Sequence, residues 1–240
     1  MALPKPATKI TEFDAHYWTP TDSRIPEHVS FRERQMIGRT YEFNGLRLTC
    51  PPGIYQPDEF SSTRFMLREL FMSAHLYGPR VLDVGTGSGA LALTLARLGK
   101  TVTAIDIDSE AVECARVNAT ENGLSVDFRC SNLFEAVAGE QFDLILFNAP
   151  LRHGEIEQPV DRIACDPGGA LLLRFLREAP KYLAPKGAII LVASSAGRRE
   201  TYIEGLRGLE HRVIAAEYSQ VAGGYRWLLH IEHSGSEIGG

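Results

Sequence analysis

The chain has 240 residues, of which 44% are hydrophobic and 23% are charged, a composition typical of a globular protein with a full core. The formal net charge of −5, without any run of five Lys or Arg residues, argues against a surface for naked nucleic acid. No segment is apolar over the length that a membrane span needs, and residues 1–10 lack the apolar core of a secretory signal. We therefore expect a cytoplasmic protein with no membrane attachment.

The four cysteines, Cys50, Cys114, Cys130 and Cys165, are widely spaced and form no CxxC pair. Such spacing is typical of reduced thiols in a cytosolic protein. No group of His and Cys residues has the spacing of metal ligands, so we expect no metal site.

Residues 1–60 are expected to form an extension ahead of the main domain. Residues 3–30 are rich in proline and polar residues and predict an irregular or partly helical segment, and residues 31–37 predict a short helix. Residues 40–49 alternate between apolar and polar around Asn44-Gly45, which predicts a β-hairpin.

Strands and helices alternate through the main domain, which we place at residues 61–233. Strands are predicted at 80–84, 102–105, 125–129, 144–147, 188–192, 213–217 and 226–231, and helices at 61–76, 89–98, 109–122, 169–183 and 198–206. The early strands are short and apolar, as in a parallel sheet covered on both faces, whereas the last two suit an antiparallel edge. The expected fold is a doubly wound, seven-stranded, mostly parallel Rossmann-like α/β sheet, with a disordered tail at residues 234–240.

A glycine-rich loop lies between the first predicted strand of this sheet and the helix that follows. Residues 81–89 read Val-Leu-Asp-Val-Gly-Thr-Gly-Ser-Gly, which places Gly85, Gly87 and Gly89 two residues apart and Asp83 at the strand end. Glycine lets the backbone turn sharply and approach a ligand closely. The spacing differs from the G-x-G-x-x-G of dinucleotide sites, where a carboxylate would repel the pyrophosphate. Asp83 instead favours a cationic ligand, such as the amino acid and sulfonium end of S-adenosylmethionine.

Asp106 closes the next strand, 17 residues after Gly89, where an acidic side chain can accept hydrogen bonds from two ribose hydroxyls. With this carboxylate and the glycine loop, the chain from about residue 77 to residue 232 resembles the class I S-adenosylmethionine-dependent methyltransferase superfamily. The resemblance implies S-adenosyl-L-methionine as the cofactor, and Asn132 stands where relatives carry an Asp that accepts from the adenine amino group. The alternative for Asn132 is a turn-stabilising role. The cofactor-binding residues that we expect are Asp83, Gly85, Thr86, Gly87, Gly89, Asp106, Ile107, Asn132 and Asn148.

The fourth strand ends in Asn148-Ala149-Pro150-Leu151, which is similar to the (D/N/S)-P-P-(Y/F/W) motif of methyltransferases that act on planar nitrogens. The resemblance implies that the Asn148 side-chain oxygen and the Ala149 carbonyl accept hydrogen bonds from an –NH₂ group and orient its lone pair. Ala149 replaces the first proline of the motif, and Leu151 replaces the aromatic residue that stacks on a flat substrate. Both departures weaken the expectation of a nucleobase.

Residues 41–57 and 168–187 resemble segments of the release-factor glutamine methyltransferase family, and the similarity covers about residues 40–195. We predict an enzyme that N-methylates an amine, amide or guanidine of a small molecule, a peptide or a protein, rather than nucleic acid. The alternatives are methylation of a nucleic-acid base, O-methylation, and an inactive subunit that keeps the fold to bind a partner.

The roles predicted at the substrate side rest on residues around the motif. The catalytic residues that we expect are Asn148, Pro150 and His153, and the expected substrate contacts are Tyr55, Ala149 and Leu151. A surface position is the alternative to a general-base role for His153, and packing on the hairpin is the alternative for Tyr55. Glu155, Asp161 and Asp166 form an acidic stretch that either attracts a cationic substrate or is a solvated surface.

Overall fold

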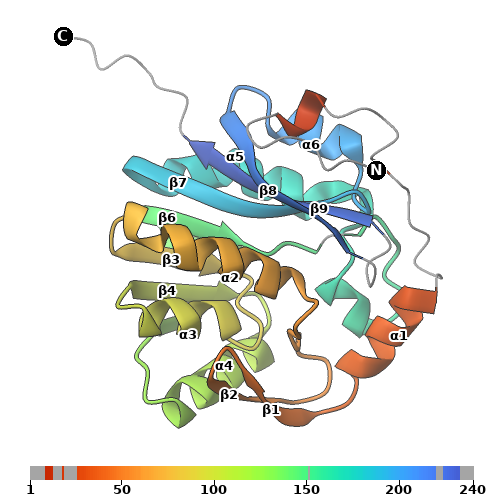
Figure 1. The fold of residues 1–240 in the computed structure, drawn as a ribbon, viewed down its shortest axis with the longest axis vertical. Helices are drawn as coiled ribbons and strands as arrows, with labels where there is room; N and C mark the ends of the chain where they lie inside the picture. Colours follow the sequence, from red (N-terminus) through yellow and green to blue (C-terminus); the bar gives the residue numbers. More distant parts are fainter. Residues whose placement is uncertain (1–8, 13–17, 19–25, 151, 220–223, 233–240) are drawn as a thin grey trace.

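The computed structural model describes residues 9–12, 18, 26–150, 152–219 and 224–232. Its centre is a seven-stranded sheet with the strand order β5-β4-β3-β6-β7-β9-β8, and helices cover both faces (Figure 1). β9 is antiparallel to both β7 and β8, and the other neighbouring strands are parallel. The predicted doubly wound sheet with an antiparallel edge is therefore confirmed.

The structure contains all the strands and helices that the sequence predicts for the main domain. The strands are β1 (Arg39–Phe43), β2 (Leu46–Cys50), β3 (Arg80–Val84), β4 (Thr101–Asp106), β5 (Asp127–Cys130), β6 (Phe142–Phe147), β7 (Leu183–Ser194), β8 (Glu210–Ser219) and β9 (Gly224–Glu232). The α-helices are α1 (Pro26–Gln35), α2 (Ser62–Ser73), α3 (Ala90–Arg97), α4 (Ser109–Glu121), α5 (Ala170–Glu178) and α6 (Arg199–Gly205). The 3₁₀ helices are η1 (Ile10–Glu12), η3 (Ala74–Leu76), η4 (Glu135–Val137), η5 (Pro159–Ile163), η6 (Pro167–Gly169) and η7 (Ala179–Tyr182). No helix among the described residues has the length and apolar character needed to cross a bilayer.

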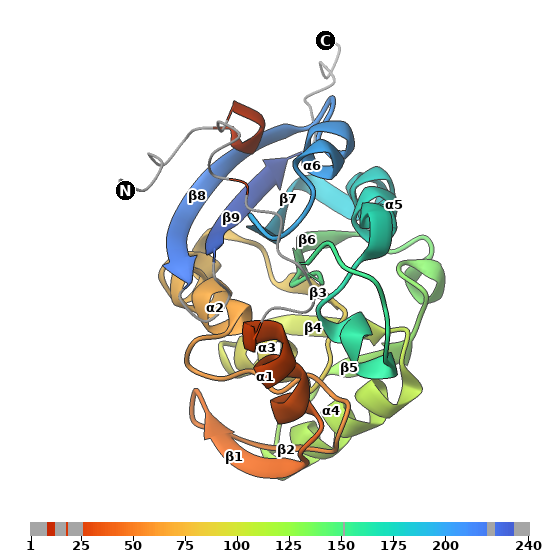
Figure 2. The same cartoon turned by 90° about the vertical axis from the view of Figure 1, so that its right-hand side faces the viewer.

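Alternate side chains of the central strands face two separate hydrophobic clusters, one on each face of the sheet. On β6, Leu144 and Leu146 belong to the cluster that includes α2, α3 and α4, whereas Ile145 and Phe147 belong to the cluster that includes α5 and α6. The two groups of helices lie on opposite sides of the sheet in Figure 2. Because both faces are buried, the strands need no polar face, which explains their continuous apolar runs.

The predicted hairpin is formed by β1 and β2 and is docked against the main domain. Asn44 and Gly45 have positive φ angles of 51° and 70°, as the two-residue turn that matches strand twist requires. The Asn118 side chain on α4 accepts a hydrogen bond from the Thr49 N–H at 2.8 Å. The hairpin therefore extends the hydrophobic cluster on the α4 side of the sheet.

α1 and α5 differ most in extent from the prediction, and proline explains both differences. α1 already begins at Pro26 instead of residue 31, because proline at the first helical position lacks only an N–H that would be unpaired there. α5 ends at Glu178, and the residues up to Tyr182 form η7, because Pro180 has no N–H to continue the α-helical ladder.

Candidate functional site

A cavity of about 1000 Å³ lies at the carboxyl ends of β3, β4 and β6. Parallel strands bring these ends to one edge of the sheet, where open α/β sheets bind their ligands. α1 and residues 52–63 line it from the N-terminal side, and residues of η5, of η6 and of the start of β9 complete its wall. The cavity therefore gathers residues from both ends of the chain.

The glycine loop lines the cavity with backbone atoms that no side chain covers at Gly85 and Gly87. Gly85 and Thr86 donate from their N–H groups to the Ile105 carbonyl at 2.8 and 3.0 Å, which ties the loop to the end of β4. Gly85 and Gly87 have positive φ angles of 68° and 54°, a region that favours glycine. A Cβ atom on Gly87 would lie 3.5 Å from the Cβ of Tyr55, so any side chain there would take up space at the cavity wall.

Gly89, which was predicted to contact the cofactor, does not line the cavity in the described structure. It precedes α3 with φ of 81°, and a Cβ atom there would lie 3.0 Å from the Cβ of Ala115 on α4. The structure therefore gives Gly89 a packing role, because it allows α3 and α4 to approach each other closely.

Asp83 lies at the end of β3 and is almost completely buried. It accepts a hydrogen bond from the Thr86 hydroxyl at 2.8 Å, which fixes the carboxylate beneath the glycine loop. Burial raises the pKa of Asp83 to about 7, against the lowering effect of the Thr86 hydrogen bond. A cationic ligand would stabilise the charged form of this carboxylate.

Asp106 lies at the end of β4, on the other side of the glycine loop from β6. It accepts hydrogen bonds from the Gly87 N–H at 2.9 Å and from the Asp108 N–H at 3.0 Å. Burial raises its pKa, and the two backbone hydrogen bonds oppose that rise. The next residue, Ile107, lines the cavity with 71% of its surface exposed and offers an apolar face beside the carboxylate.

Asn132 lines the same part of the cavity but is already engaged by other side chains. Its Nδ2 donates to Glu135 at 2.9 Å, and its Oδ1 accepts from Arg174 at 2.7 Å. One lone pair of Oδ1 remains available, since an amide oxygen accepts two hydrogen bonds. The predicted contact with adenine therefore stays a prediction. Arg174, which the sequence did not suggest, helps to position the Asn132 side chain.

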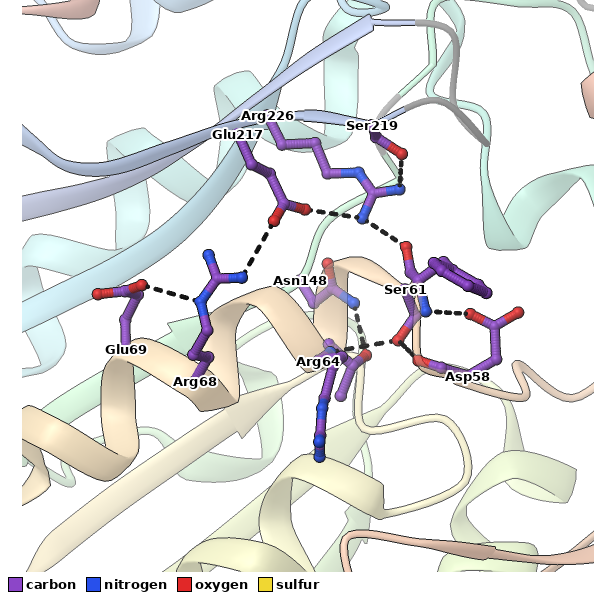
Figure 3. Close-up of polar contacts among 11 residues, drawn as sticks. Asp58, Ser61, Arg64, Arg68, Glu69, Asn148, Glu217, Ser219 and Arg226 are labelled. Carbon is purple, nitrogen blue, oxygen red and sulfur yellow. Dashed lines mark hydrogen bonds and ion pairs between the residues drawn. The ribbon is translucent and has the colours of Figure 1, made fainter. Parts of the chain in front are cut away.

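Asn148 follows β6 and points toward the first turn of α2 (Figure 3). Its Nδ2 donates to the Thr63 hydroxyl at 3.0 Å, whereas its Oδ1 is buried and has no hydrogen-bond partner among the described residues. Ala149 and Pro150 line the cavity beside it, and Leu151 lies outside the described residues. A buried amide oxygen without a donor is costly unless a ligand supplies one.

The two remaining predicted residues at this end of the cavity have different positions. Tyr55 lines the cavity, with its ring centroid 6.4 Å from that of Phe31 on α1. His153 is exposed, donates its backbone N–H to the Ala196 carbonyl at 2.8 Å, and is not among the residues that line the cavity. We therefore leave His153 out of the proposed chemistry.

Two of the three carboxylates in the acidic stretch after β6 are engaged within the protein, whereas Glu155 is exposed. Asp161 is buried and accepts from Arg32 on α1 at 2.7 and 3.1 Å. Burial raises its pKa, but the Gln158 and Glu157 N–H groups and Arg32 outweigh this, so the pKa lies below its ordinary value. Both carboxylate oxygens of Asp166 accept from N–H groups in the first turn of α5, at 3.1 and 3.0 Å. The carboxylates of Asp161 and Asp166 therefore already accept hydrogen bonds from other parts of the protein.

Sequence reasoning missed three residues that shape the site: Arg32, Thr63 and Arg226. Arg226, on β9, is buried at the cavity wall and donates to the Phe60 carbonyl at 2.8 Å (Figure 3). Arg32 and Arg226 act on parts of the chain more than a hundred residues away, so no local motif marks them. The one available signal for Arg226 was a charged residue in a largely apolar strand.

The model of the methyltransferase small domain family matches residues 45–218 of the chain. The chain belongs to this methyltransferase family. The match spans the glycine loop, Asp106 and Asn148. As predicted, the protein is an S-adenosylmethionine-dependent methyltransferase with S-adenosylmethionine as its cofactor.

The similar proteins are also methyltransferases. A putative protein N5-glutamine methyltransferase of Methanocaldococcus jannaschii is 34% identical over 180 residues, which cover 72% of this chain and 88% of that protein. A ubiquinone biosynthesis O-methyltransferase of Xanthomonas euvesicatoria is 40% identical over 115 residues, which cover 45% of this chain and 48% of that protein. A solved structure of a T. thermophilus 16S rRNA N2 methyltransferase, in complex with AdoMet and guanosine, superposes with a TM-score of 0.59 at 23% identity and covers 82% of this chain and 50% of that one. The names of these relatives differ in the acceptor, so the acceptor of this methyltransferase has to be inferred from its own site.

Proposed function

We propose that this methyltransferase acts on nitrogen, in an amine, amide or guanidine of a small molecule, a peptide or a protein. The observation that carries the proposal is the Asn148 Oδ1 atom, which is buried at the cavity and lacks a donor. An amide oxygen in this position can accept a hydrogen bond from an N–H group of the acceptor.

The half of the cavity around β3 and β4 fits S-adenosylmethionine. The charged lining residues on these strands and directly after them are all acidic: Asp83, Asp106, Asp108 and Glu110. Two positive centres of the cofactor, its sulfonium and its ammonium group, match that charge. We assign the ribose hydroxyls to Asp106 and one face of the adenine to Ile107, whose exposed apolar side chain adjoins that carboxylate.

The carboxylate of the cofactor fits the first turn of α2. Ser62 and Thr63 line the cavity, and their backbone N–H groups have no acceptor among the described residues. No acidic residue occupies this turn. A helix N-terminus with free N–H groups favours an anion.

S-adenosylmethionine, when bound, supplies a methyl group that is already activated for transfer to a nucleophile. Asn148 Oδ1 and the Ala149 carbonyl would hold the N–H groups of the acceptor and leave the nitrogen lone pair free to react. With this donor bound, the N–C bond would form as the S–C bond breaks, and the nitrogen would release a proton to water. Orientation and exclusion of water are what the protein contributes, and no side-chain nucleophile is needed.

The lining of the cavity favours nitrogen over oxygen acceptors. A hydroxyl acceptor would need a base to remove its proton, and among the described residues the cavity lining offers carboxylates but no histidine for this role. Phe31 and Tyr55 line the cavity and can stack on a flat group in place of the aromatic residue that the motif lacks.

Two measurements test the proposal. Calorimetric titration should show binding of S-adenosylmethionine, and tritiated methyl transfer into fractionated lysate should place the label on a nitrogen. Label that alkali releases as methanol would indicate a methyl ester and contradict the proposal, as would a methyl ether in the purified product.

Replacing Asn148 separates a role in the reaction from a role in binding. Asn148→Ala should lower turnover far more than cofactor affinity, whereas Asn148→Asp, which keeps an acceptor oxygen, should retain more activity. An equal loss of turnover and cofactor affinity, or no loss at all, would show that Asn148 is only structural.

A further inference from the structure

Charge is divided between the two halves of the cavity. The described lining residues on β3 and β4 and on the segments that directly follow these strands include four carboxylates and no basic side chain. Four arginines line the cavity: Arg34 comes from α1, whereas Arg152 and Arg162 come from the segment after β6 and Arg226 comes from β9. We call the part of the cavity beyond β6, with these last three, the arginine half. The sheet order places these strands on opposite sides of β3, so the separation follows from the topology.

The carboxylates in the arginine half are already engaged. Both oxygens of Asp166 accept N–H groups in the first turn of α5, and Asp58 Oδ1 accepts the Phe60 N–H at 2.9 Å. Asp161, just behind the lining, is held by Arg32. The arginines therefore outnumber the carboxylates here, and the carboxylates present have other partners.

Arg226 is the most constrained of the four arginines. Its side chain is only 5% exposed and donates to the Phe60 carbonyl, to Glu217 at 3.4 Å and to the Ser219 hydroxyl at 2.5 Å. Its Nε–H is buried and has no acceptor among the described residues. Glu217 is shared with Arg68, also at 3.4 Å, so it offsets the charge of Arg226 only in part (Figure 3).

Arg226 and Asn148 are fixed by the same short segment. The Phe60 carbonyl accepts from Arg226, and the Thr63 hydroxyl accepts from Asn148. If the reacting nitrogen of an acceptor lies at Asn148, a group a few bonds away in the same molecule therefore reaches the arginine half. A buried, fixed guanidinium binds a carboxylate or phosphate better than a flexible surface lysine does.

We propose that the acceptor is a small anionic molecule whose carboxylate or phosphate group binds in the arginine half of the cavity while its nitrogen lies at Asn148. This inference rests on the proposed N-methyltransferase function. A nucleic acid would also bring phosphates, but the chain carries a net charge of −5. In addition, α1 lines one side of the cavity and is held in place by the ion pair of Arg32 with Asp161. A polymer would need a basic track that continues beyond the site.

The test uses the full chain, S-adenosylmethionine with a tritiated methyl group, and lysate separated into small molecules, proteins and nucleic acids. Small-molecule products then pass over an anion exchanger. We expect label in small molecules that the exchanger retains, and loss of retention after phosphatase treatment would identify phosphate rather than carboxylate. Label in unretained molecules, in protein or in nucleic acid would overturn the inference while leaving methyl transfer intact. Absence of label from every fraction would instead contradict the proposed function itself.

Variants connect that outcome to the arginines. Arg226→Gln and Arg162→Gln, the second at an exposed residue, should each lower the amount of labelled anionic product by about tenfold or more. This is the loss expected when a charged hydrogen bond to the acceptor is removed. The affinity of each variant for S-adenosylhomocysteine should stay within about twofold of that of the parent protein. Arg226→Lys should recover part of the loss. Arg177→Gln, in an exposed pair away from the cavity, is the matched control and should change nothing.

Weakened S-adenosylhomocysteine binding with unchanged acceptor KM would assign the arginines to the cofactor carboxylate and overturn the inference. Arg162 is on the surface, so this variant answers the question even if Arg226→Gln fails to fold.

Discussion

Asn148 and Thr63 are 85 residues apart in the chain, yet the Asn148 amide donates to the Thr63 hydroxyl at 3.0 Å. Thr63 is buried in the first turn of α2, whose N-cap Ser61 accepts the Arg64 N–H at 3.2 Å. In this arrangement the amide nitrogen is occupied by Thr63, and the amide oxygen is left without a partner among the described residues. A well-capped helix thus orients the group that we assign to acceptor recognition.

Thr63→Val should lower turnover by about tenfold or more, because the hydroxyl that orients the Asn148 amide is replaced by a methyl group of similar size. Thr63→Ser keeps the hydroxyl and should recover most of the activity. Steady-state kinetics with the identified acceptor, together with calorimetry for the cofactor, would measure both effects. Equal activity of the Val and Ser variants would show that the hydrogen bond does not position Asn148.

Cofactor binding should tighten as the pH rises through about 7. The Asp83 carboxylate is neutral below its pKa of about 7, and a cationic ligand prefers the charged form. Affinity for S-adenosylmethionine should therefore increase by up to about tenfold per pH unit below 7 and level off above it. Calorimetric titrations in buffers from mildly acidic to mildly alkaline pH would measure this slope.

Asp83→Asn is the control for that slope, since the amide can still accept from Thr86 but does not ionise. The variant should bind the ligand more weakly at high pH, and its remaining pH dependence should come from Asp106, whose pKa is also raised.

A raised carboxyl pKa means that the folded, ligand-free protein loses stability as the pH rises from about 4 to 7. Asp83→Asn should therefore raise the Tm of the ligand-free protein at neutral pH. A lower Tm would show that the charged carboxylate stabilises the empty fold.

The Arg32–Asp161 pair should contribute more stability than an exposed ion pair does. Arg32→Met leaves a buried carboxylate without its guanidinium and should destabilise the protein by about 1–3 kcal/mol. The exposed pair of Arg177 and Glu204 is the comparison, and Arg177→Met should cost about 1 kcal/mol or less. Because the pKa of Asp161 is lowered, the difference should be present at neutral pH and decline as the pH falls below about 4. Urea unfolding of both variants at two pH values would reveal whether the two pairs are equivalent.

Features that depend on neighbours along the chain could be predicted from the sequence. The turn at Asn44-Gly45 requires positive φ at both positions, and the structure has it. The glycine loop lies between β3 and α3 as predicted, because Gly85 and Gly87 supply backbone angles that other residues rarely adopt.

Features that depend on tertiary partners could not be predicted. Asp161 looked like part of an acidic surface because its partner, Arg32, precedes it by more than a hundred residues. Gly89 was predicted to contact the ligand because its spacing matches that of the other glycines, and the structure shows a packing neighbour for it, Ala115 on the next helix. Spacing alone does not distinguish a glycine that faces a ligand from one that faces a helix.

That distinction at Gly89 gives a stability prediction with a built-in control. Gly89→Ala and Gly123→Ala both place alanine at positive φ, 81° and 64°, and each should lose about 1–2 kcal/mol from backbone strain. Only at Gly89 would the new Cβ also meet a neighbour, 3.0 Å from Ala115, whereas nothing lies within 4 Å of it at Gly123. Overpacking should add about 1–3 kcal/mol to the cost of Gly89→Ala.

Chemical denaturation of the two single variants, and of Gly89→Ala combined with Ala115→Gly, would isolate the contact. The double variant should be more stable than the sum of the two single changes predicts, by about 1 kcal/mol, because removing the Ala115 methyl group relieves the clash but not the backbone strain. If the changes were additive and Gly89→Ala cost no more than Gly123→Ala, α3 and α4 would have room for a side chain at this position. The glycine would then be required for its backbone angle or for the cofactor, and S-adenosylhomocysteine affinity of the Gly89→Ala variant would decide between those two.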